Sequence, residues 1–251
     1  MESRRHARLA ALLVAGGRGA RFGADAPKQF LSLGGTPLLV HAARALHESP
    51  IVEALHLVVP AGWEDRVREL LEEARLVRKL RAVVPGGATR QESVWQGLTT
   101  IIGCTHVLVH DAARPFLTDR LIQATVSASE RQGAATVALP VSDTLFRGEV
   151  SGVDEVVAGS HAVAPIPRDG VWTVQTPQVF EVELLREAHR HARARGLEAT
   201  DDGTLVLEIG RRVELVRGNW WNIKVTRPED LLRAEKIWMM RDQLPDTEED
   251  A

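Results

Sequence analysis

The sequence of 251 residues has a single cysteine, Cys104, and no excess of basic residues. One cysteine excludes a disulfide within the chain and a cysteine-based zinc site, and it is typical of a protein from a reducing compartment. Lys and Arg number 31 against 34 Asp and Glu, so the formal net charge is −3. A general nucleic-acid binder needs a positive surplus, whereas this balance is still compatible with a local basic pocket for a phosphorylated small molecule. We expect a cytoplasmic protein that does not bind nucleic acid.

Long hydrophobic runs are also absent. No stretch reaches the roughly 18–20 apolar residues that would span a bilayer, so we expect no membrane association. The N-terminus imitates a secretory signal, because Arg4 and Arg5 precede the apolar run Leu9–Ala15. This run is short and ends in a glycine-rich loop, which is typical of a buried strand in a parallel sheet. We therefore interpret Leu9–Ala15 as a strand.

What the sequence does contain is an alternation of short apolar runs with amphipathic helical patterns. The predicted helices cover residues 63–74, Thr118–Arg131, Val182–Arg195 and Pro228–Met240. The predicted strands are Leu9–Ala15, Ala54–Pro60, Arg81–Pro85, His106–His110, Ala134–Pro140, Val171–Gln175 and Val213–Arg217. Such alternation predicts a single α/β domain over residues 1–251, with a mostly parallel, Rossmann-like sheet and helices on both faces.

The alternation stops between Ser142 and Asp169, where the sequence is polar and its apolar residues recur with a period of two. This segment is too short to bury a core of its own. We interpret it as a projecting β-hairpin arm, an insertion over about 142–169 that packs against a second subunit. A mobile loop is the alternative. The acidic tail at 245–251 is expected to fray.

Two known phosphate-binding motifs are missing from the loop that follows the first strand. The loop lacks the Gly-Lys-Ser/Thr ending of a P-loop, and Phe22 stands where the dinucleotide fingerprint needs its third glycine. Glycines let a backbone approach a ligand closely, and cations beside backbone amides suit a triphosphate. The loop supplies both, with glycines at 16, 17, 19 and 23 and with Arg18, Arg21 and Lys28. A solvated basic loop is the alternative.

Two further segments place charge where ligands of open α/β sheets bind, beyond the carboxyl ends of the strands. Asp111 and Arg114 follow the fourth predicted strand, where they can serve a metal ion, a hydroxyl group, a phosphate or only each other. Lys224 lies in an apolar context just before the last predicted helix. A lysine is unfavourable there unless it faces a cleft, so both segments are candidates for ligand contact.

Four segments occur together and in order: Ala15–Phe30 with its glycines and Pro27-Lys28-Gln29, Val109–Pro115, Thr173–Gln178 and Asn222–Thr226. With them the sequence resembles the 2-C-methyl-D-erythritol 4-phosphate cytidylyltransferases of the non-mevalonate isoprenoid pathway, from about Leu9 to Met240. The glycine loop alone would indicate only a nucleotidyltransferase. Trp220 and Trp221 depart from the pattern, because the relatives usually carry an acidic residue before Asn222.

The resemblance implies transfer of CMP from CTP to 2-C-methyl-D-erythritol 4-phosphate with release of pyrophosphate. It assigns Arg21 and Lys28 to stabilising the transition state, and Arg168 and Lys224 to positioning the attacking phosphate. The residues that it places around the two substrates are Ala15, Gly16, Gly17, Gly19, Gly86, Gly87, Ser93, Asp111, Arg114, Thr144 and Thr176. It further implies Mg²⁺ as the cofactor, held mainly by the CTP phosphates with Asp111 as the candidate protein ligand, and a homodimer formed through the arm.

Other functions stay open at this point. A ribitol 5-phosphate cytidylyltransferase shares the glycine loop, and a sugar-1-phosphate nucleotidyltransferase using another base is a more distant rival. A non-catalytic nucleotide-binding regulator would keep the fold but would be expected to lose one of the four assigned cations, all of which are present. We interpret His189 and His191 as a surface pair on a helix rather than a metal site.

Overall fold

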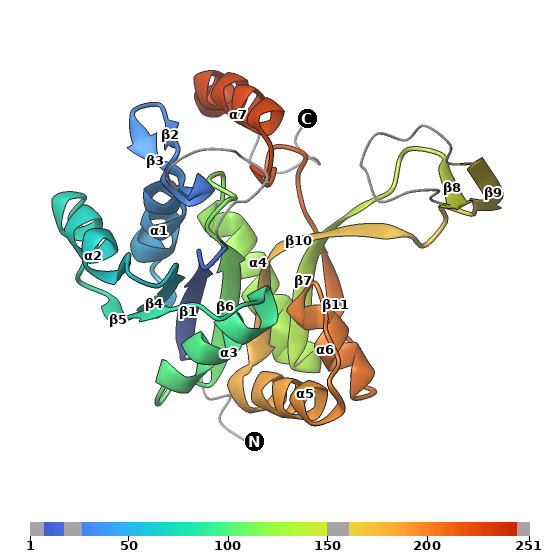
Figure 1. Ribbon diagram of the computed structural model, residues 1–251, viewed down its shortest axis with the longest axis horizontal. Coiled ribbons are helices and arrows are strands. Elements are labelled where there is room, and N and C mark those ends of the chain that lie inside the picture. Colours follow the sequence, from blue (N-terminus) through green and yellow to red (C-terminus); the bar gives the residue numbers. More distant parts are fainter. Residues whose placement is uncertain (1–7, 18–26, 150–160, 245–251) are drawn as a thin grey trace.

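The computed structural model, shown in Figure 1, describes residues 8–17, 27–149 and 161–244. A twisted sheet of seven strands forms its centre, in the order β11-β7-β10-β6-β1-β4-β5. Neighbouring strands run parallel except at β10, which lies antiparallel between β6 and β7. The prediction of an α/β fold with a mostly parallel sheet is confirmed.

The strands of this sheet are β1 (Leu9–Val14), β4 (Val52–Val59), β5 (Leu80–Pro85), β6 (His106–Asp111), β7 (Ala134–Pro140), β10 (Trp172–Glu181) and β11 (Glu214–Arg217). The α-helices are α1 (Leu38–Glu48), α2 (Glu64–Glu73), α3 (Arg90–Thr100), α4 (Asp119–Gln132), α5 (Val182–Arg195), α6 (Asp202–Glu208) and α7 (Pro228–Met240). The short elements are the 3-10 helices η2 (Lys28–Phe30) and η3 (Arg241–Gln243) and the hairpin of β2 (Ser32–Leu33) and β3 (Thr36–Pro37). Among the α-helices, α1, α3 and α6 were not predicted, and neither were the short elements.

The central strand β1 explains why the apolar run at the N-terminus is continuous rather than alternating. All six residues of β1 are buried, and successive side chains point to opposite faces of the sheet. Leu9, Ala11 and Leu13 pack in the cluster that contains α1, α2 and α4, whereas Leu12 packs with α3, α5 and α6. Helices thus cover both faces, as the sequence predicted. The last helix, α7, packs in a third cluster against β2.

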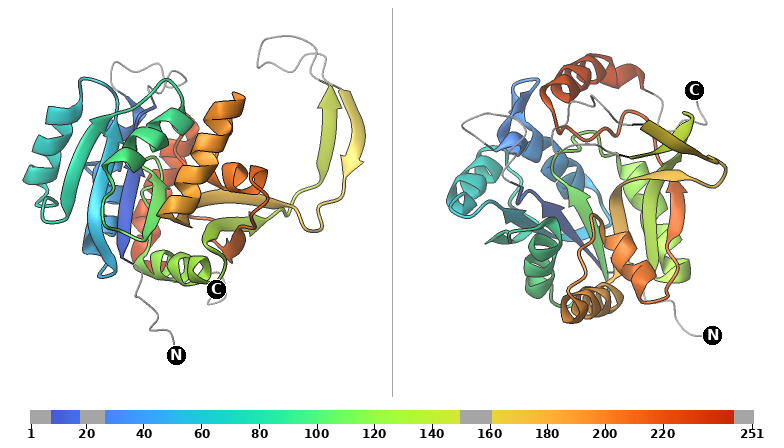
Figure 2. Two further views of the ribbon diagram at one scale, coloured as in Figure 1. Left: turned by 90° about the horizontal axis from the view of Figure 1, so that it is seen from below. Right: turned by 45° about the vertical axis from the view of Figure 1, so that its right-hand side comes forward.

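The segment predicted as an arm contains a separate two-stranded antiparallel sheet of β8 (Leu145–Glu149) and β9 (His161–Ile166). These strands continue outward from β7 and β10 and stand clear of the main sheet, as Figure 2 shows from a second direction. Residues 150–160 and the predicted acidic tail at 245–251 lie outside the described residues. Within the described part of the chain, no helix is long and apolar enough to cross a membrane.

Candidate active site

Two neighbouring cavities lie among the described residues, and the larger of the two, about 700 Å³, lies beyond the carboxyl ends of β1, β5 and β6. This is the edge at which ligands of open α/β sheets bind. Nine of the residues predicted to contact substrate line it: Ala15, Gly16, Gly17, Lys28, Gly86, Gly87, Ser93, Asp111 and Lys224. Arg21 and Gly19 lie outside the described residues.

The loops after β1 and β5 approach each other so closely that Gly16 and Gly86 have no room for a side chain. A Cβ atom built at Gly16 would lie 2.8 Å from Ser93 Oγ, and one at Gly86 would lie 3.1 Å from the Cα atom of Gly16. Ser93 Oγ is held in place because it donates to Thr89 O at 2.9 Å and accepts from Gly87 N–H at 3.2 Å. The two glycine loops and Ser93 therefore form one wall of the larger cavity.

The segment that carries Lys28 is tied to the same loop by Gln29. The side chain of Gln29 is 2% exposed, and its Nε2 donates to the carbonyl oxygen of Ala15. Phe30, the next residue, stacks on Trp63 with 4.3 Å between ring centroids. Both contacts hold η2 at the edge of the cavity, so the Pro-Lys-Gln motif serves to place Lys28. The sequence contained this motif, but the role of Gln29 was not predicted.

A second cavity of about 290 Å³ lies beside the first. Arg114 and Thr176, which the resemblance placed around the substrates, line it together with residues that were not predicted, among them Gln175, Gln178 and Asp201. Three charged residues line both cavities: Arg90, Asp111 and Lys224. A ligand in one cavity would therefore lie next to a ligand in the other.

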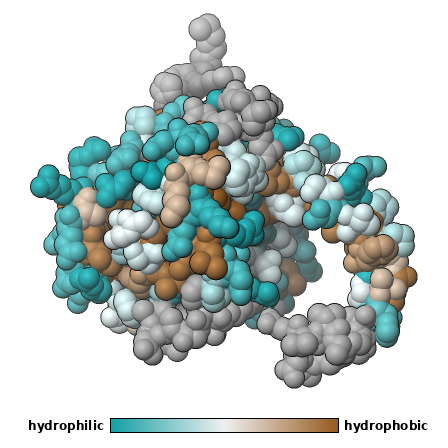
Figure 3. All heavy atoms as spheres, turned by 90° about the horizontal axis from the view of Figure 1, so that it is seen from above, coloured by the Kyte–Doolittle hydropathy of each residue, from teal (hydrophilic) through white to brown (hydrophobic). Residues whose placement is uncertain are grey.

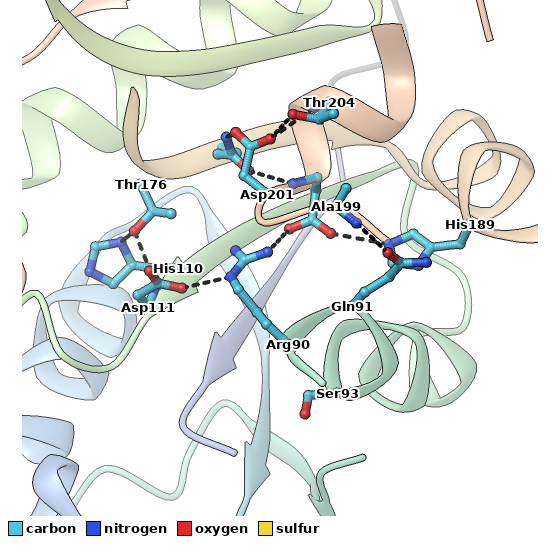
Figure 4. A network of polar contacts seen from close by, with 12 residues as sticks. Arg90, Gln91, Ser93, His110, Asp111, Thr176, His189, Ala199, Asp201 and Thr204 are labelled. Carbon is cyan, nitrogen blue, oxygen red and sulfur yellow. Dashed lines mark hydrogen bonds and ion pairs between the residues drawn. The ribbon is translucent and has the colours of Figure 1, made fainter. Parts of the chain in front are cut away.

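These three residues belong to a chain of alternating charges. Asp111 Oδ2 lies 2.6 Å from Lys224 Nζ. Asp111 Oδ1 accepts from Arg90 Nε at 3.2 Å, as Figure 4 shows. Arg90 Nη1 also donates to Asp202 Oδ2 at 2.7 Å, and Asp202 Oδ1 lies 3.1 Å from His189 Nε2. Burial by itself would raise the pKa of Asp111, but Arg90 and Lys224 outweigh that effect and hold the pKa well below its ordinary value. Asp111 is therefore ionised at any physiological pH.

Two hydrogen bonds tie the loop that carries Lys224 to the segment that follows Asp111. Arg114 Nη1 donates to Asn222 O at 2.6 Å, and Val225 N–H donates to Ala113 O at 2.9 Å. Trp221, in the position where an acidic residue was expected, is 2% exposed and packs with residues of α7. The departure from the family pattern thus anchors the loop that carries Lys224 instead of disturbing it.

His110 joins the two sides of the smaller cavity through a chain of hydrogen bonds. Its Nε2 lies 3.0 Å from the carbonyl oxygen of Arg114, which can only accept, so Nε2 carries the proton. Nδ1 then accepts from Thr176 Oγ1 at 3.1 Å, and that hydroxyl accepts from Asp111 N–H at 3.1 Å. Burial lowers the pKa of His110 to about 4, in keeping with a neutral ring.

Two of the predicted residues lie away from both cavities. Thr144 and Arg168 are exposed at the base of the arm, where Arg168 Nη1 donates to the carbonyl oxygen of Ser142. Neither side chain contributes to the cavities of its own subunit. The structure therefore does not place them with the predicted residues that line the cavities.

The prediction that His189 and His191 form a surface pair is wrong for His189. Its side chain is fully buried, and it contacts Asp202, which is itself 1% exposed. Asp202 and Arg90 were also missed as parts of the site. No local pattern marked them, because Arg90 and Asp202 are 112 positions apart in the chain.

The described residues do not form a metal-binding cage. No group of three His, Cys, Asp or Glu side chains in this part of the protein could hold a metal ion. Asp111, the predicted candidate ligand, already has a cation on each carboxylate oxygen, which makes it a poor ligand for a further cation. The arrangement is suited instead to anions, which Lys28, Lys224 and the backbone amides of the glycine loops can bind.

Comparisons with known proteins agree with this geometry. A family model described as 2-C-methyl-D-erythritol 4-phosphate cytidylyltransferase matches residues 9–240. A protein of that name from Pelotomaculum thermopropionicum is 42% identical over 231 residues, which cover 92% of this chain and 94% of the relative. The relative from Desulforamulus reducens is 40% identical over 234 residues, covering 93% and 97%.

Solved structures give the same result. The crystal structure of 2-C-methyl-D-erythritol 4-phosphate cytidylyltransferase from Thermus thermophilus is similar with a TM-score of 0.72 and 35% identity, covering 91% of this chain and 98% of that one. The structure of 4-diphosphocytidyl-2C-methyl-D-erythritol synthase from Anaerococcus prevotii has a TM-score of 0.77 and 26% identity, covering 92% and 96%. The likeness therefore extends over nearly the whole chain.

Proposed function

The chain belongs to the 2-C-methyl-D-erythritol 4-phosphate cytidylyltransferase family, and we propose how its residues divide the work of the reaction. The enzyme transfers CMP from CTP to 2-C-methyl-D-erythritol 4-phosphate in isoprenoid biosynthesis. The family and the activity implied by the sequence resemblance are thus confirmed.

The observation that carries the proposal is that two adjacent cavities share Arg90, Asp111 and Lys224. CTP occupies the larger cavity, with its base against the loop of Gly86, Gly87 and Ser93 and its phosphates near Lys28. The polyol phosphate occupies the smaller cavity, near Arg114 and Thr176. Lys224 lies where the two meet, which is the place where the attacking oxygen must reach the α-phosphorus of CTP.

Catalysis in this arrangement depends on position and charge. The oxygen of the acceptor phosphate attacks the α-phosphorus of CTP, a P–O bond forms, and pyrophosphate leaves with the electron pair of the broken bond. Both reactants are anions and repel each other, so cations that bring them together lower the barrier. We assign Lys28 and Arg21 to the charge that develops at the triphosphate. Lys224 and Arg168 orient the attacking phosphate.

Nucleotidyltransferases of this family generally use a divalent metal ion. We assign Mg²⁺ to this role, bound by phosphate oxygens of CTP, because the described side chains offer no cage for it. Mg²⁺ characteristically keeps several waters and binds substrate phosphates with few protein ligands. Bound in this way, it would neutralise part of the triphosphate charge.

A homodimer formed through the arm completes the proposal. Thr144 and Arg168 lie outside the cavities of their own subunit, and the arm exposes apolar side chains, with Phe146 61% and Val163 50% exposed. Apolar colour on the arm is visible in Figure 3, where the arm curves away from the body of the molecule. Exposed apolar residues on a projecting hairpin favour contact with a second subunit. A cytoplasmic location suits the single cysteine and the nucleotide substrate.

The test is pyrophosphate release from CTP with Mg²⁺, comparing 2-C-methyl-D-erythritol 4-phosphate with ribitol 5-phosphate as acceptor. We expect turnover with the first acceptor and little with the second. A preference for ribitol 5-phosphate would move the enzyme to another polyol phosphate, and silence with both acceptors, from protein that still binds CTP, would favour a regulator.

The assigned cations are tested in the same assay. Lys28→Ala and Lys224→Ala are each expected to lower kcat by several orders of magnitude, because each removes charge that must be in place when the two anions meet. Arg120→Ala, an exposed residue of α4, serves as a control for loss of a positive charge elsewhere. Near-normal turnover in either lysine variant would contradict the assigned roles.

A further inference from the structure

Arg90 joins the two substrate cavities, although no pattern in the sequence assigned it a role. It is the first residue of α3, whose start is fixed by Thr89, because Thr89 Oγ1 accepts from Glu92 N–H at 3.1 Å. From this position the side chain reaches between Asp111 and Asp202, with 21% of it exposed. Arg90 also lines both cavities.

The partners of Arg90 are themselves held in place. Asp202 is 1% exposed and is contacted from the other side by His189, so it forms a rigid anchor for the guanidinium group. A second nitrogen of that group, Nε, holds Asp111 Oδ1 at 3.2 Å. The third, Nη2, is buried and has no hydrogen-bond partner among the described residues. Arg90 thus fixes Asp111 relative to α3 and α6 and keeps a donor group that the protein itself does not use.

The two carboxylate oxygens of Asp111 contact two different cations. Oδ1 is held by Arg90, and Oδ2 lies 2.6 Å from Lys224 Nζ. Rotation of the carboxylate about its Cβ–Cγ bond would break the contact at Oδ1, so this contact also restrains the position of Oδ2. Lys224 is 37% exposed and has a long, flexible side chain, so this contact with Asp111 is what fixes its ammonium group.

We propose that Arg90 is a positioning residue for the cytidylyl transfer, which fixes Asp111 and through it the Lys224 ammonium group at the boundary between the two cavities. The inference rests on the proposed function, in which Lys224 binds the attacking phosphate. Reactants must be aligned closely, and a misplacement of about 1 Å lowers a rate on the order of a hundredfold. Arg90 therefore acts on the rate through Lys224.

The test compares Arg90→Gln with Arg186→Gln in steady-state kinetics for both substrates. Arg186 is a matched control, because it is 25% exposed, donates to the carbonyl oxygens of Leu98 and Ile101, and lies outside both cavities. For Arg90→Gln we expect kcat/KM for the polyol phosphate to fall about a hundredfold with a raised KM, and KM for CTP to change less than about threefold. Arg186→Gln is expected to leave both KM values unchanged.

A loss of folding is separated from a loss of positioning by a second variant. Arg90→Gln leaves the buried Asp202 with one partner fewer, which lowers stability. The double variant Arg90→Gln with Asp202→Asn removes that unbalanced carboxylate. We expect the urea midpoint of the double variant to lie above that of Arg90→Gln, while its KM for the polyol phosphate stays raised.

Two results would overturn the inference. One is an unchanged KM for the polyol phosphate in Arg90→Gln, and the other is a return of this KM to the wild-type value in the double variant, which would show that Arg90 only supports folding. The wild-type protein is assayed alongside. If it releases no pyrophosphate with the polyol phosphate, the proposed function itself fails, and the inference fails with it.

Discussion

At the scale of single residues, the site depends on buried groups whose protonation is decided by their neighbours. His110 is fully buried and donates from Nε2 while it accepts at Nδ1, so only the neutral ring satisfies both partners. A protonated ring would place a second donor against the hydroxyl of Thr176, which already accepts from Asp111 N–H. The neutral state of His110 therefore keeps Thr176 and the backbone of Asp111 in place.

This arrangement predicts a loss of stability on mild acidification. The pKa of His110 is about 4 in the folded protein and about 6.5 when unfolded, so the unfolded chain binds more protons between these values. The contribution of His110 to stability is fully present above the pKa of the unfolded chain, and it is lost as the pH falls toward 4. From pH 7 to pH 5 the His110 contribution amounts to about 2 kcal/mol.

Urea unfolding of the wild type and His110→Gln at both pH values measures this contribution. The variant is expected to lose less stability between pH 7 and pH 5, although His56, whose pKa burial also lowers to about 4, keeps a share of the effect in both proteins. Equal losses in the two proteins would show that His110 is not responsible.

Gly16 and Gly17 in the loop after β1 differ in the space around them, which predicts different effects when each is replaced by alanine. No described atom lies within 4 Å of a Cβ built at Gly17, whereas a Cβ at Gly16 would meet Ser93 Oγ at 2.8 Å. Gly17→Ala is expected to keep the thermal midpoint and raise KM for CTP several-fold, because its methyl group enters the larger cavity. Gly16→Ala is expected to lower the midpoint itself. An unchanged KM in Gly17→Ala would mean that CTP does not approach this loop.

At the scale of elements, helix α3 connects the core to the site. One end carries Arg90 and Ser93 at the cavities, while Gly97 lies against the sheet, where a Cβ would come within 2.3 Å of Leu12 Cδ1 in β1. The small residue lets the helix lie close to β1 and β4. The position of α3 on the sheet therefore also sets the position of Arg90 and Ser93.

Gly97→Ala tests this packing, because two effects of the substitution have opposite signs. Alanine favours a helix over glycine by about 1 kcal/mol, but overpacking a core destabilises by about 1–3 kcal/mol. We expect a net loss of stability in urea unfolding and a lower kcat. Gln96→Ala, at an exposed position of the same helix, is expected to change stability by less than about 0.5 kcal/mol. A more stable Gly97→Ala protein would contradict close packing of α3.

At the scale of the whole molecule, the predicted arm carries Arg168 away from the cavities of its own chain. Lys224 lines the cavities of its own chain, and Arg168 does not. If the arm of one subunit reaches the site of another in a symmetric dimer, each site combines Lys224 of one chain with Arg168 of the other. This geometry can be tested without knowledge of the interface.

Mixing two inactive proteins, Lys224→Ala and Arg168→Ala, is expected to restore activity. Half of the dimers after subunit exchange contain one chain of each kind, and one of their two sites has both wild-type residues, so about one quarter of the wild-type rate is expected. Sites completed within single chains would give no recovery. Sedimentation of each variant alone checks that the dimer persists.

Much of the fold and part of the site could be predicted because local patterns encode them. The glycine loop and Lys28 come next in the sequence after the apolar run of β1, and Asp111 is the last residue of β6. The ends of these strands therefore predicted the edge of the sheet at which the cavities lie. Helices α1, α3 and α6 were missed. In α3 the polar and small residues, such as Ser93 and Gly97, obscure the apolar face, because they serve the site and the close contact with the sheet.

By itself the sequence determined the α/β class, the family and the cations of the glycine loop and of the Lys224 segment, because each is written in neighbouring residues. Only the tertiary structure decided the antiparallel direction of β10, the burial of His189 and the union of the two cavities at Arg90. Arg90 and Asp202 are separated by 112 positions and form an ion pair at 2.7 Å. No local pattern marks such a pair, because packing of the helices on the sheet brings the two charges together.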